Sequence, residues 1–224
     1  MDIQKFERDL NLLAGRACRA NEYENEIQSS KVRSGLEDVR EKLVELYKRN
    51  LVKINHSAME LLCAGKLIEL GYEDVEVEHQ IKENLVCDLF AKDASGATRT
   101  VEIETGFVPP EYALQPLTYS KARIASKLSR YSAFSNSFTL GTTPTNVLQI
   151  PSVFLVPQEL RSKEEISGIK ALCDLYYRNP PITGEEISCA KLDSIFVIDV
   201  DRVSVEEVRA APYLMKAQDF MKKS

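Results

Sequence analysis

Hydrophobic residues recur at helical spacing through the first third of the chain. Residues 1–33 predict a polar amphipathic helix followed by an irregular stretch, NEYENEIQSSK. Ser34, with Glu37 three residues later, predicts a capping box at the start of a second helix. The apolar positions of that helix are Leu36, Val39, Leu43, Leu46 and Tyr47. A third helix is expected to follow Asn55 and to be stopped by Gly71.

The spacing then changes to alternation, which is typical of strands. The segment Tyr72–Ile81 carries on one face Val75, Val77, His79 and Ile81. Leu85–Ala91 and Thr98–Thr105 predict two further strands. The short polar link KDASG between them predicts an antiparallel hairpin.

The second half of the chain alternates between helical and strand-like segments. A helix from about Leu117 to Phe134 and a short strand, Ser137–Gly141, follow the hairpin. Val153–Val156 and Ile195–Val200 predict buried strands, because both are short apolar runs. A helix near Lys163–Tyr177 lies between these two runs.

This order of elements predicts an α/β fold. Residues 52–142 read as helix, three strands, helix and strand, which we interpret as the core. Residues 1–51 form an N-terminal helical segment. Residues 143–224 are expected to form a C-terminal α/β extension that packs on the core.

Composition narrows the class of protein. The 224 residues are 44% hydrophobic and 28% charged, as in soluble globular proteins. No apolar run reaches the about 18 residues of a membrane span, and the first residues lack a cleavable signal pattern. Five scattered cysteines without a CxxC pair indicate reduced thiols in a cytoplasm. The net charge of −5 argues against non-specific coating of nucleic acid, although a local basic groove is compatible with it.

Three acids in the predicted hairpin carry the first chemical signal. In TVEIET, Glu102 and Glu104 share one strand face, while Val101 and Ile103 point the other way. Neighbouring carboxylates repel each other, and a divalent cation such as Mg²⁺ is a simple counter-charge. In LVCDLFA, the lone acid Asp88 would close such a site across the hairpin. The alternative is a half-exposed sheet whose acids face solvent and pair with lysine or arginine.

The helix before the hairpin adds two residues. Successive side chains are separated by about 100°, which places His56 within the core-facing stripe and Glu60 at its edge. The other members of this stripe are Met59, Cys63, Leu67 and Leu70. A carboxylate in this place is expected to be paired or to bind a ligand, and both roles stay open for Glu60. We interpret His56 as a hydrogen-bonded core histidine.

The helix after the hairpin carries a basic stripe. Arg123, Lys127 and Arg130 share one face, beside the apolar stripe of the same helix. That apolar stripe consists of Leu117, Ile124, Leu128 and Tyr131. Lys121 lies on its opposite rim. A solvated charged face is the alternative, but three cations beside an acidic hairpin suit phosphate chemistry and predict nucleic-acid contacts.

In order and spacing, these residues resemble the PD-(D/E)XK nuclease superfamily. The resemblance covers about residues 52–142 and rests on an acid-bearing helix, a hairpin reading CDLFA…VEIET, a basic helix and a strand. It implies a restriction-endonuclease-like fold, a central mixed sheet flanked by helices. It also implies that Asp88 and Glu102 bind Mg²⁺, with Mn²⁺ as a substitute, and that Glu60 joins them. The phrase VEIETG is similar to archaeal and viral members.

One position departs from the family pattern, because Glu104 stands where the motif has lysine. The resemblance implies that a lysine from the following helix replaces it, Lys127 in the first place and Lys121 in the second. Glu104 would then be an additional metal ligand. The implied activity is metal-assisted hydrolysis of DNA, with Lys127 and Arg123 stabilising charge on the phosphate oxygens.

Two other functions stay open. One is a catalytically degenerate nucleic-acid-binding module on the same fold. The other is a scaffold protein, in which Asp88, Glu102 and Glu104 would point apart or into separate salt bridges. Other chemistries lack their motifs, since the sequence has no GxxxxGK[ST], GxGxxG or GxSxG. With two histidines, His56 and His79, a histidine-rich zinc site is not expected.

The region from about Thr145 onward carries no chemical motif that we can interpret. Asp199 and Asp201 in IFVIDVDR share a strand face, but acids are common where a strand ends in a turn. This region could extend the sheet, contact DNA or form a homodimer interface.

Overall fold

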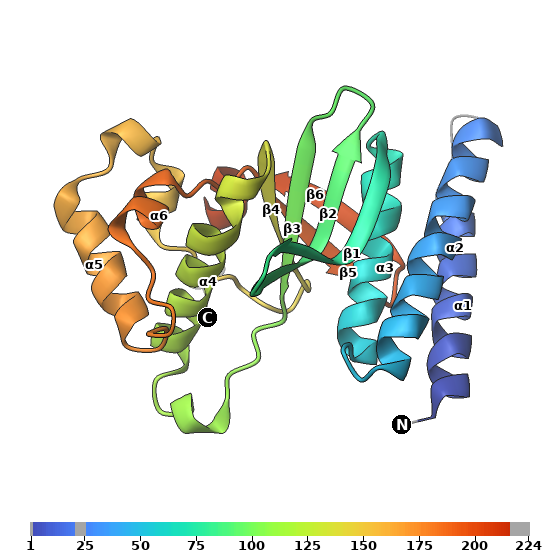
Figure 1. Ribbon diagram of the computed structural model, residues 1–224, viewed down its shortest axis with the longest axis horizontal. Helices are drawn as coiled ribbons and strands as arrows, with labels where there is room; N and C mark the ends of the chain where they lie inside the picture. The colour runs from blue at the N-terminus through green and yellow to red at the C-terminus, as the bar shows by residue number, and fades with distance from the viewer. Residues whose placement is uncertain (1, 21–25, 216–224) are drawn as a thin grey trace.

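The computed structural model describes residues 2–20 and 26–215. One six-stranded sheet crosses the molecule, with helices on both faces (Figure 1). Its strands, which lie side by side in chain order, are β1 (Tyr72–Lys82), β2 (Leu85–Asp93), β3 (Thr98–Glu104), β4 (Ser137–Thr142), β5 (Ser194–Asp199) and β6 (Ser204–Arg209). Pairing is antiparallel from β1 to β3, parallel from β3 to β5, and antiparallel between β5 and β6. The predicted α/β fold with a central mixed sheet and flanking helices is therefore confirmed.

The helices form two groups, called the first and the second layer, one on each side of the sheet (Figure 1). The first layer contains α1 (Ile3–Ala20), α2 (Glu26–Lys48) and α3 (Ile54–Glu69). The second contains α4 (Pro116–Tyr131), α5 (Lys163–Asp174) and α6 (Gly184–Cys189). None of the helices in the described ranges is both long and apolar enough to cross a membrane.

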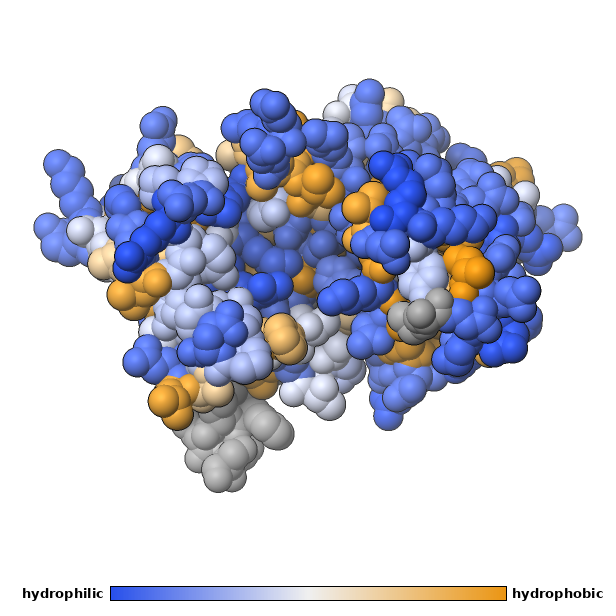
Figure 2. All heavy atoms as spheres, turned by 60° about the horizontal axis from the view of Figure 1, so that its bottom comes forward, coloured by the Kyte–Doolittle hydropathy of each residue, from blue (hydrophilic) through white to orange (hydrophobic). Residues whose placement is uncertain are grey.

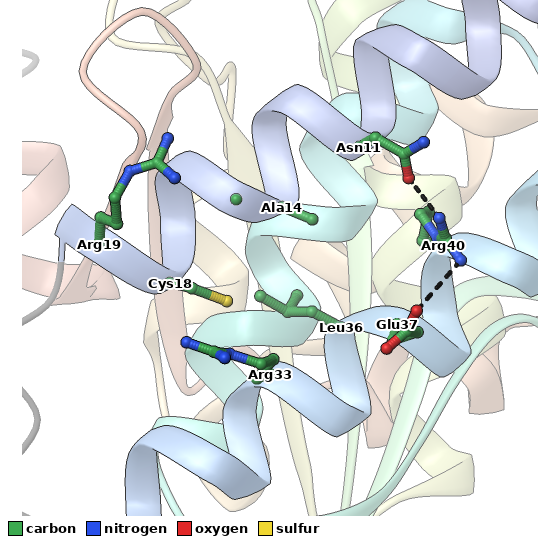
Figure 3. Close-up of a pocket in the computed structure, with 9 residues that line it drawn as sticks. Asn11, Ala14, Cys18, Arg19, Arg33, Leu36, Glu37 and Arg40 are labelled. Atoms are coloured by element: carbon green, nitrogen blue, oxygen red, sulfur yellow. Dashed lines mark hydrogen bonds and ion pairs between the residues drawn. The ribbon is translucent and has the colours of Figure 1, made fainter. Parts of the chain in front are cut away.

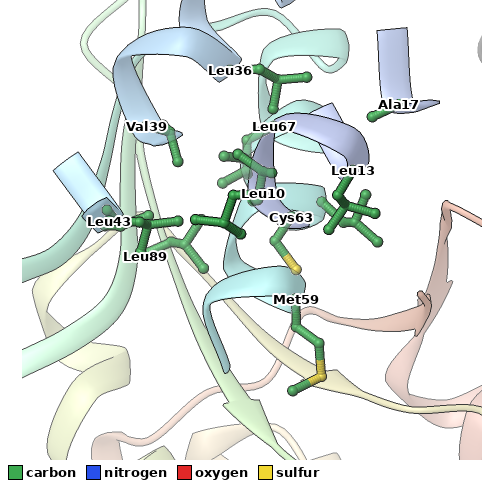
Figure 4. Packing of buried hydrophobic residues seen from close by; sticks show 14 of the residues in the cluster. Leu10, Leu13, Ala17, Leu36, Val39, Leu43, Met59, Cys63, Leu67 and Leu89 are labelled. Carbon is green, nitrogen blue, oxygen red and sulfur yellow. The ribbon is translucent and has the colours of Figure 1, made fainter. Parts of the chain in front are cut away.

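The first layer buries a large hydrophobic core against β2, β3 and β5 (Figure 4). As predicted, Met59, Cys63 and Leu67 of α3 are buried in it. Leu61 is buried too, because α1 and α2 cover the outer side of α3 and leave it almost no solvent-facing surface. Leu70 is 43% exposed, against the prediction, because it lies past the last turn of α3, at the C-cap.

The second layer encloses a separate core on the opposite face of the sheet. Ile124 and Leu128 of α4 are buried there, together with Phe138 and Leu140 of β4. Leu117 was predicted to belong to this stripe but is 67% exposed. It lies in the first turn of α4, where the side chains line a surface pocket between α4 and α5 instead of the core.

The structure corrects the predicted start of the second helix. α2 already begins at Glu26, so Ser34 lies inside the helix and is not its N-cap. Val32 is buried with Leu36 in the first core, so the apolar stripe begins one turn earlier than predicted. Packing of this stripe outweighs the local preference of serine for a cap. Residues 21–25 of the predicted irregular stretch lie outside the described residues.

A second correction concerns Val153–Val156, which was predicted to be a strand. The segment forms a short 3-10 turn, η3 (Ser152–Leu155). Prolines on both sides, Pro151 and Pro157, lack the N–H group that a ladder requires. Val153 and Phe154 of the apolar run are buried in the second core, while Leu155 is exposed, and the periodicity of so short a run does not distinguish a buried turn from a strand.

The C-terminal region completes the same sheet. The predicted strand Ile195–Val200 is β5, and β6 pairs with it at the sheet edge. The pattern does not reveal β6, because its sequence SVEEVR is largely exposed and alternates weakly. Asp199 accepts a hydrogen bond from the Arg202 N–H over 3.0 Å, which confirms the interpretation of this acid as a turn residue.

Candidate functional site

The strands β2 and β3 separate at the point where the predicted acids lie. β2 and β3 are paired as far as Leu89 and Val101. Beyond this pair, the backbone N–H groups donate to side-chain carboxylates instead of to backbone carbonyls of the neighbouring strand. The Asp88 N–H donates to Glu102 Oε1 over 3.1 Å, and the Ile103 N–H donates to Asp88 Oδ2 over 2.5 Å. The hairpin therefore positions both carboxylates through its own backbone.

The acids of β3 are buried. Glu102 is 2% and Glu104 5% exposed, with Val101 and Ile103 fully buried on the opposite face. The alternative of a half-exposed sheet is therefore wrong in placing these acids in solvent, but its pairing of the acids with a lysine and an arginine is confirmed. Burial raises the pKa of Glu102 above its ordinary value, and the charge of Asp88 raises it further, against the opposing effect of a nearby lysine.

That lysine is Lys127, which reaches the acids from α4. Its Nζ lies 3.0 Å from Glu102 Oε2 and 3.6 Å from Asp88 Oδ2, and donates to the Ile103 carbonyl over 2.7 Å. Burial alone would lower the pKa of Lys127, but the charges of Glu102 and Asp88 outweigh burial and raise it. The ammonium group therefore stays protonated between the two acids.

Glu104 enters a different ion pair. Its carboxylate contacts the Arg123 guanidinium from α4 and accepts the Gly106 N–H over 3.1 Å. Arg123 also donates to the Tyr119 hydroxyl over 3.4 Å. Burial alone would lower the pKa of Arg123, but the charge of Glu104 outweighs it and raises it. The predicted pairing of Glu104 with the metal-type acids is not present; this acid is occupied by Arg123.

Two residues of α3 approach Asp88 from the other side. Glu60 is fully buried, and its Oε1 is 2.9 Å from His56 Nδ1. The second oxygen of Glu60 has no hydrogen-bond partner among the described residues. His56 Nδ1 also lies 3.8 Å from Asp88 Oδ1. Burial would lower the pKa of His56, but the hydrogen bond to Glu60 and the charge of Asp88 outweigh it and raise it to about 9.

Glu78 of β1 belongs to the same group and was not predicted. Its backbone is left-handed, with a φ of +49°, which is uncommon for a residue with a side chain. Burial, together with the charges of Glu60 and Asp88, raises the pKa of Glu78 to about 7. His56, Glu60, Glu78 and Asp88 each offer an atom of ligand type, and these atoms all lie within 4.8 Å of one another. The sequence does not distinguish Glu78 from the neighbouring acids of β1. What sets Glu78 apart is its left-handed backbone conformation in the folded chain.

The charge balance of this cluster fits a divalent cation. Its five carboxyl groups outnumber its three cations, which are Lys127, Arg123 and protonated His56. Burial and mutual repulsion raise the pKa values of Glu60, Glu78 and Glu102. Carboxylate oxygens are the ligands that Mg²⁺ and Mn²⁺ prefer, and imidazole is a further ligand type for Mn²⁺-like ions. Glu60 and Glu78 hydrogen-bond to each other when one of the two carboxyl groups holds a proton, and a bound cation would take the place of that proton. To bind a metal, His56 would have to lose its proton.

The remaining predicted residues lie elsewhere. Lys121 is exposed and lines the pocket between α4 and α5. Arg130 donates to the Pro180 carbonyl over 2.7 Å and lies over the ring of Tyr177. Within the described ranges, neither side chain contacts the acidic cluster, although Lys127, on the same helix, does.

The surface is hollowed in more than one place. Figure 2 shows a hollow in the middle of one face, between the part of the molecule that contains α4 to α6 and the part that contains α1 to α3, with hydrophilic residues inside it. A separate pocket of about 400 Å³ lies between α1 and α2 (Figure 3). There, Arg40 donates to Asn11 and pairs with Glu37.

Comparison with protein-family models, with curated proteins and with solved structures finds no match to this chain. The functional argument therefore rests on the residues of the site itself.

Proposed function

We propose that the protein is a metal-dependent nuclease that hydrolyses DNA phosphodiester bonds. The observation that supports this most is the place of Lys127. It comes from the helix after the hairpin, and its ammonium group lies between Asp88 and Glu102. Asp88 is shared with the ligand-type group of His56, Glu60 and Glu78 on its other side. A cation-binding group beside a buried ammonium is what phosphoryl chemistry requires.

The residues take distinct roles in this proposal. Glu60, Asp88 and Glu78 would hold the cation, and the bound ion would polarise the scissile phosphate and acidify a water molecule. Because Lys127 stays protonated, it acts as a fixed positive charge toward the phosphate oxygens and not as a general base. Glu102 accepts the Asp88 N–H and faces Lys127, so it orients both groups.

Glu104 acts as a positioning residue in this proposal. It fixes the Arg123 guanidinium and the turn at Gly106, where the chain leaves β3 toward α4. Because its charge is balanced by Arg123, Glu104 contributes less to cation binding than Asp88. The proposed metal ligands therefore differ from the sequence-based set by the gain of Glu78 and the loss of Glu102 and Glu104.

Cleavage of plasmid and single-stranded DNA in Mg²⁺ or Mn²⁺ tests the proposal. We expect the wild type to cut, and Asp88→Asn and Lys127→Met to lower the rate at least about 100-fold, as loss of one charge-stabilising group typically does. Asp199→Asn, an acid in a turn at the end of β5, is the matched control and should retain activity. Equal rates for wild type, Asp88→Asn and Lys127→Met would refute the assignment of the site.

A non-catalytic nucleic-acid-binding module is the second candidate. One observation favours a non-catalytic protein: Asp88, Glu102 and Glu104 each have a partner within the protein itself, namely a cation or a backbone N–H. The separate ion pair of Glu104 with Arg123 is also what a scaffold protein would show, and such a protein would not bind DNA. The binding module predicts DNA binding without metal-dependent cutting. Calorimetric titration with Mn²⁺ separates the two, because a nuclease requires binding at the acidic cluster that Asp88→Asn abolishes.

A further inference from the structure

A pocket of about 640 Å³ opens between the turn that joins β1 to β2 and the end of α4. Leu85 is the first residue of β2, Phe134 follows α4, and two prolines, Pro180 and Pro181, complete the apolar lining. These side chains give the pocket a largely apolar lining. Two cationic side chains, Lys82 and Arg130, line the same pocket.

Two cations of the pocket lie over aromatic rings. The Lys82 ammonium is 4.3 Å from the centre of the Phe134 ring. The Arg130 guanidinium is 5.6 Å from the centre of the Tyr177 ring, while one of its nitrogens donates to Pro180. Aromatic faces combined with lysine and arginine are the features by which proteins bind single-stranded nucleic acid.

Two acids also line the pocket, but one of them is already engaged. Glu186 accepts hydrogen bonds from the N–H and the hydroxyl of Thr183 in the capping box of α6. Glu83 is the other acid. The capping bonds hold Glu186 in place but leave its charge, so the two cations of the pocket balance its two acids.

The pocket adjoins the acidic cluster along both of its walls. Arg130 follows Lys127 by three residues, which is less than one turn of α4. Leu85 precedes Asp88 by three residues of β2, a distance of about 10 Å along the strand. Leu85 and Asp88 point to opposite faces of β2, so a strand of nucleic acid would pass from the cluster to the pocket along α4, from Lys127 to Arg130.

We propose that this pocket receives an unstacked base of single-stranded DNA on the Phe134 ring, with Lys82 and Arg130 contacting the adjoining phosphates. The inference rests on the proposed function and names the form of its substrate. The Lys82 ammonium covers the ring in the free protein, and its flexible stem lets it move to a phosphate when a base takes its place. Bases in a duplex are stacked on their neighbours and do not offer a free face to the ring.

Fluorescence anisotropy with a labelled oligothymidylate and with a blunt duplex, both in EDTA, tests the inference without cleavage. We expect the single strand to bind more tightly than the duplex. Phe134→Leu should weaken single-strand binding roughly 5-fold or more, because stacking on the ring is lost while apolar packing is kept. Phe134→Tyr keeps a ring and should retain the affinity. Equal binding of both DNA forms, together with unchanged affinity in Phe134→Leu, would overturn the inference.

The dependence of affinity on salt provides a readout that a purely structural role would not change. Lys82→Ala should reduce the slope of log affinity against log salt by about 0.7, the value for one phosphate contact with a single strand. Lys92→Ala, an exposed lysine near the far end of β2, is the matched control and should leave the slope unchanged. An unchanged slope in Lys82→Ala would count against a phosphate contact at this pocket.

The two proposals can fail separately. If the protein does not cut DNA in Mg²⁺ or Mn²⁺ but single-strand binding depends on Phe134, the nuclease proposal fails and the binding pocket stands. If the protein cuts DNA at the acidic cluster and Phe134→Leu binds the single strand as well as the wild type does, the pocket proposal fails and the nuclease stands. Thermal melting of each variant shows whether a loss of binding reflects a loss of fold.

Discussion

Asp88 is the residue at which the two parts of the acidic cluster meet. Its Oδ2 accepts the Ile103 N–H and faces Lys127, while its Oδ1 lies near His56 of α3. One carboxylate thus links the separated strands of the hairpin to helices on both faces of the sheet. Any group bound on the α3 side acts on Lys127 through this residue.

Lys127→Met is expected to destabilise the protein, because it leaves Glu102 and Asp88 buried without their cation. Loss of one partner of a buried ion pair typically costs about 3–5 kcal/mol. The loss should be smaller at pH 5.5 than at pH 8, because Glu102 and Glu60, whose pKa values are raised, take up protons as the pH falls. Urea unfolding at both pH values measures this. Arg130→Met is the control, and an equal loss in both variants would contradict the prediction.

Glu78→Gly is expected to weaken cation binding without lowering the stability of the protein. Glycine adopts the left-handed backbone of this position without strain, whereas this conformation costs other residues about 1–3 kcal/mol. The substitution also removes a carboxylate that repels Glu60 and Asp88. The free energy of unfolding at pH 8 in EDTA should therefore stay equal or rise. Calorimetry should show weaker Mn²⁺ binding than in the wild type. Unchanged Mn²⁺ affinity would exclude Glu78 as a ligand.

At the scale of elements, the separation of β2 from β3 creates the site. The ladder between them stops after Leu89 and Val101, and the carboxylates of Asp88 and Glu102 then accept the backbone N–H groups. α4 follows β3 through residues 105–115, which include a short 3-10 turn, and then packs beside the sheet, which brings Lys127 to the same opening. The order of elements thus brings Asp88, Glu102 and Lys127 together.

Two serine-to-alanine substitutions test where the helices α2 and α5 begin. Ser162→Ala should cost about 1 kcal/mol, because Ser162 caps α5 and forms a complete capping box with Glu165. Ser34→Ala should be neutral or slightly stabilising, because Ser34 lies inside α2, where alanine is the better helix former. Urea unfolding compares the two variants directly. A loss of about 1 kcal/mol for Ser34→Ala would favour a helix that begins at residue 34.

For the molecule as a whole, we expect stability in EDTA to fall as the pH rises from 6 to 9. Folding raises the pKa of Glu78 from 4.5 to about 7 and that of His56 from 6.5 to about 9. The folded state therefore holds protons that the unfolded state has released, and this stabilisation disappears as the pH passes through the folded values. Mn²⁺ should flatten the decline, because a bound cation replaces the protons.

Thermal melting between pH 6 and 9, with and without Mn²⁺, measures this effect. His56→Gln should remove the upper part of the decline, because the titrating imidazole is gone. His79→Gln is the matched control, since His79 pairs with Glu76 outside the cluster. A melting temperature that rises from pH 6 to 9 in EDTA would contradict the charge balance described for the site.

Much of the fold and part of the site could be read from local patterns. Alternation in TVEIET placed Glu102 and Glu104 on one face, and helical spacing placed Lys127 beside the core-facing stripe of its helix. These inferences hold because side-chain direction follows from backbone geometry alone. The start of α2 could not be read this way, since burial of Val32 overrides the local cap signal.

The sequence by itself determined the hairpin, its three acids and the basic helix that follows, because each depends on residues close together in the chain. Only the tertiary structure decided their partners. It paired Glu104 with Arg123, placed Lys127 between Asp88 and Glu102, and added Glu78 through a left-handed residue in β1. Such choices depend on how α3, α4 and β1 pack around one opening of the sheet, and charges that are distant in sequence compete there for the same few positions.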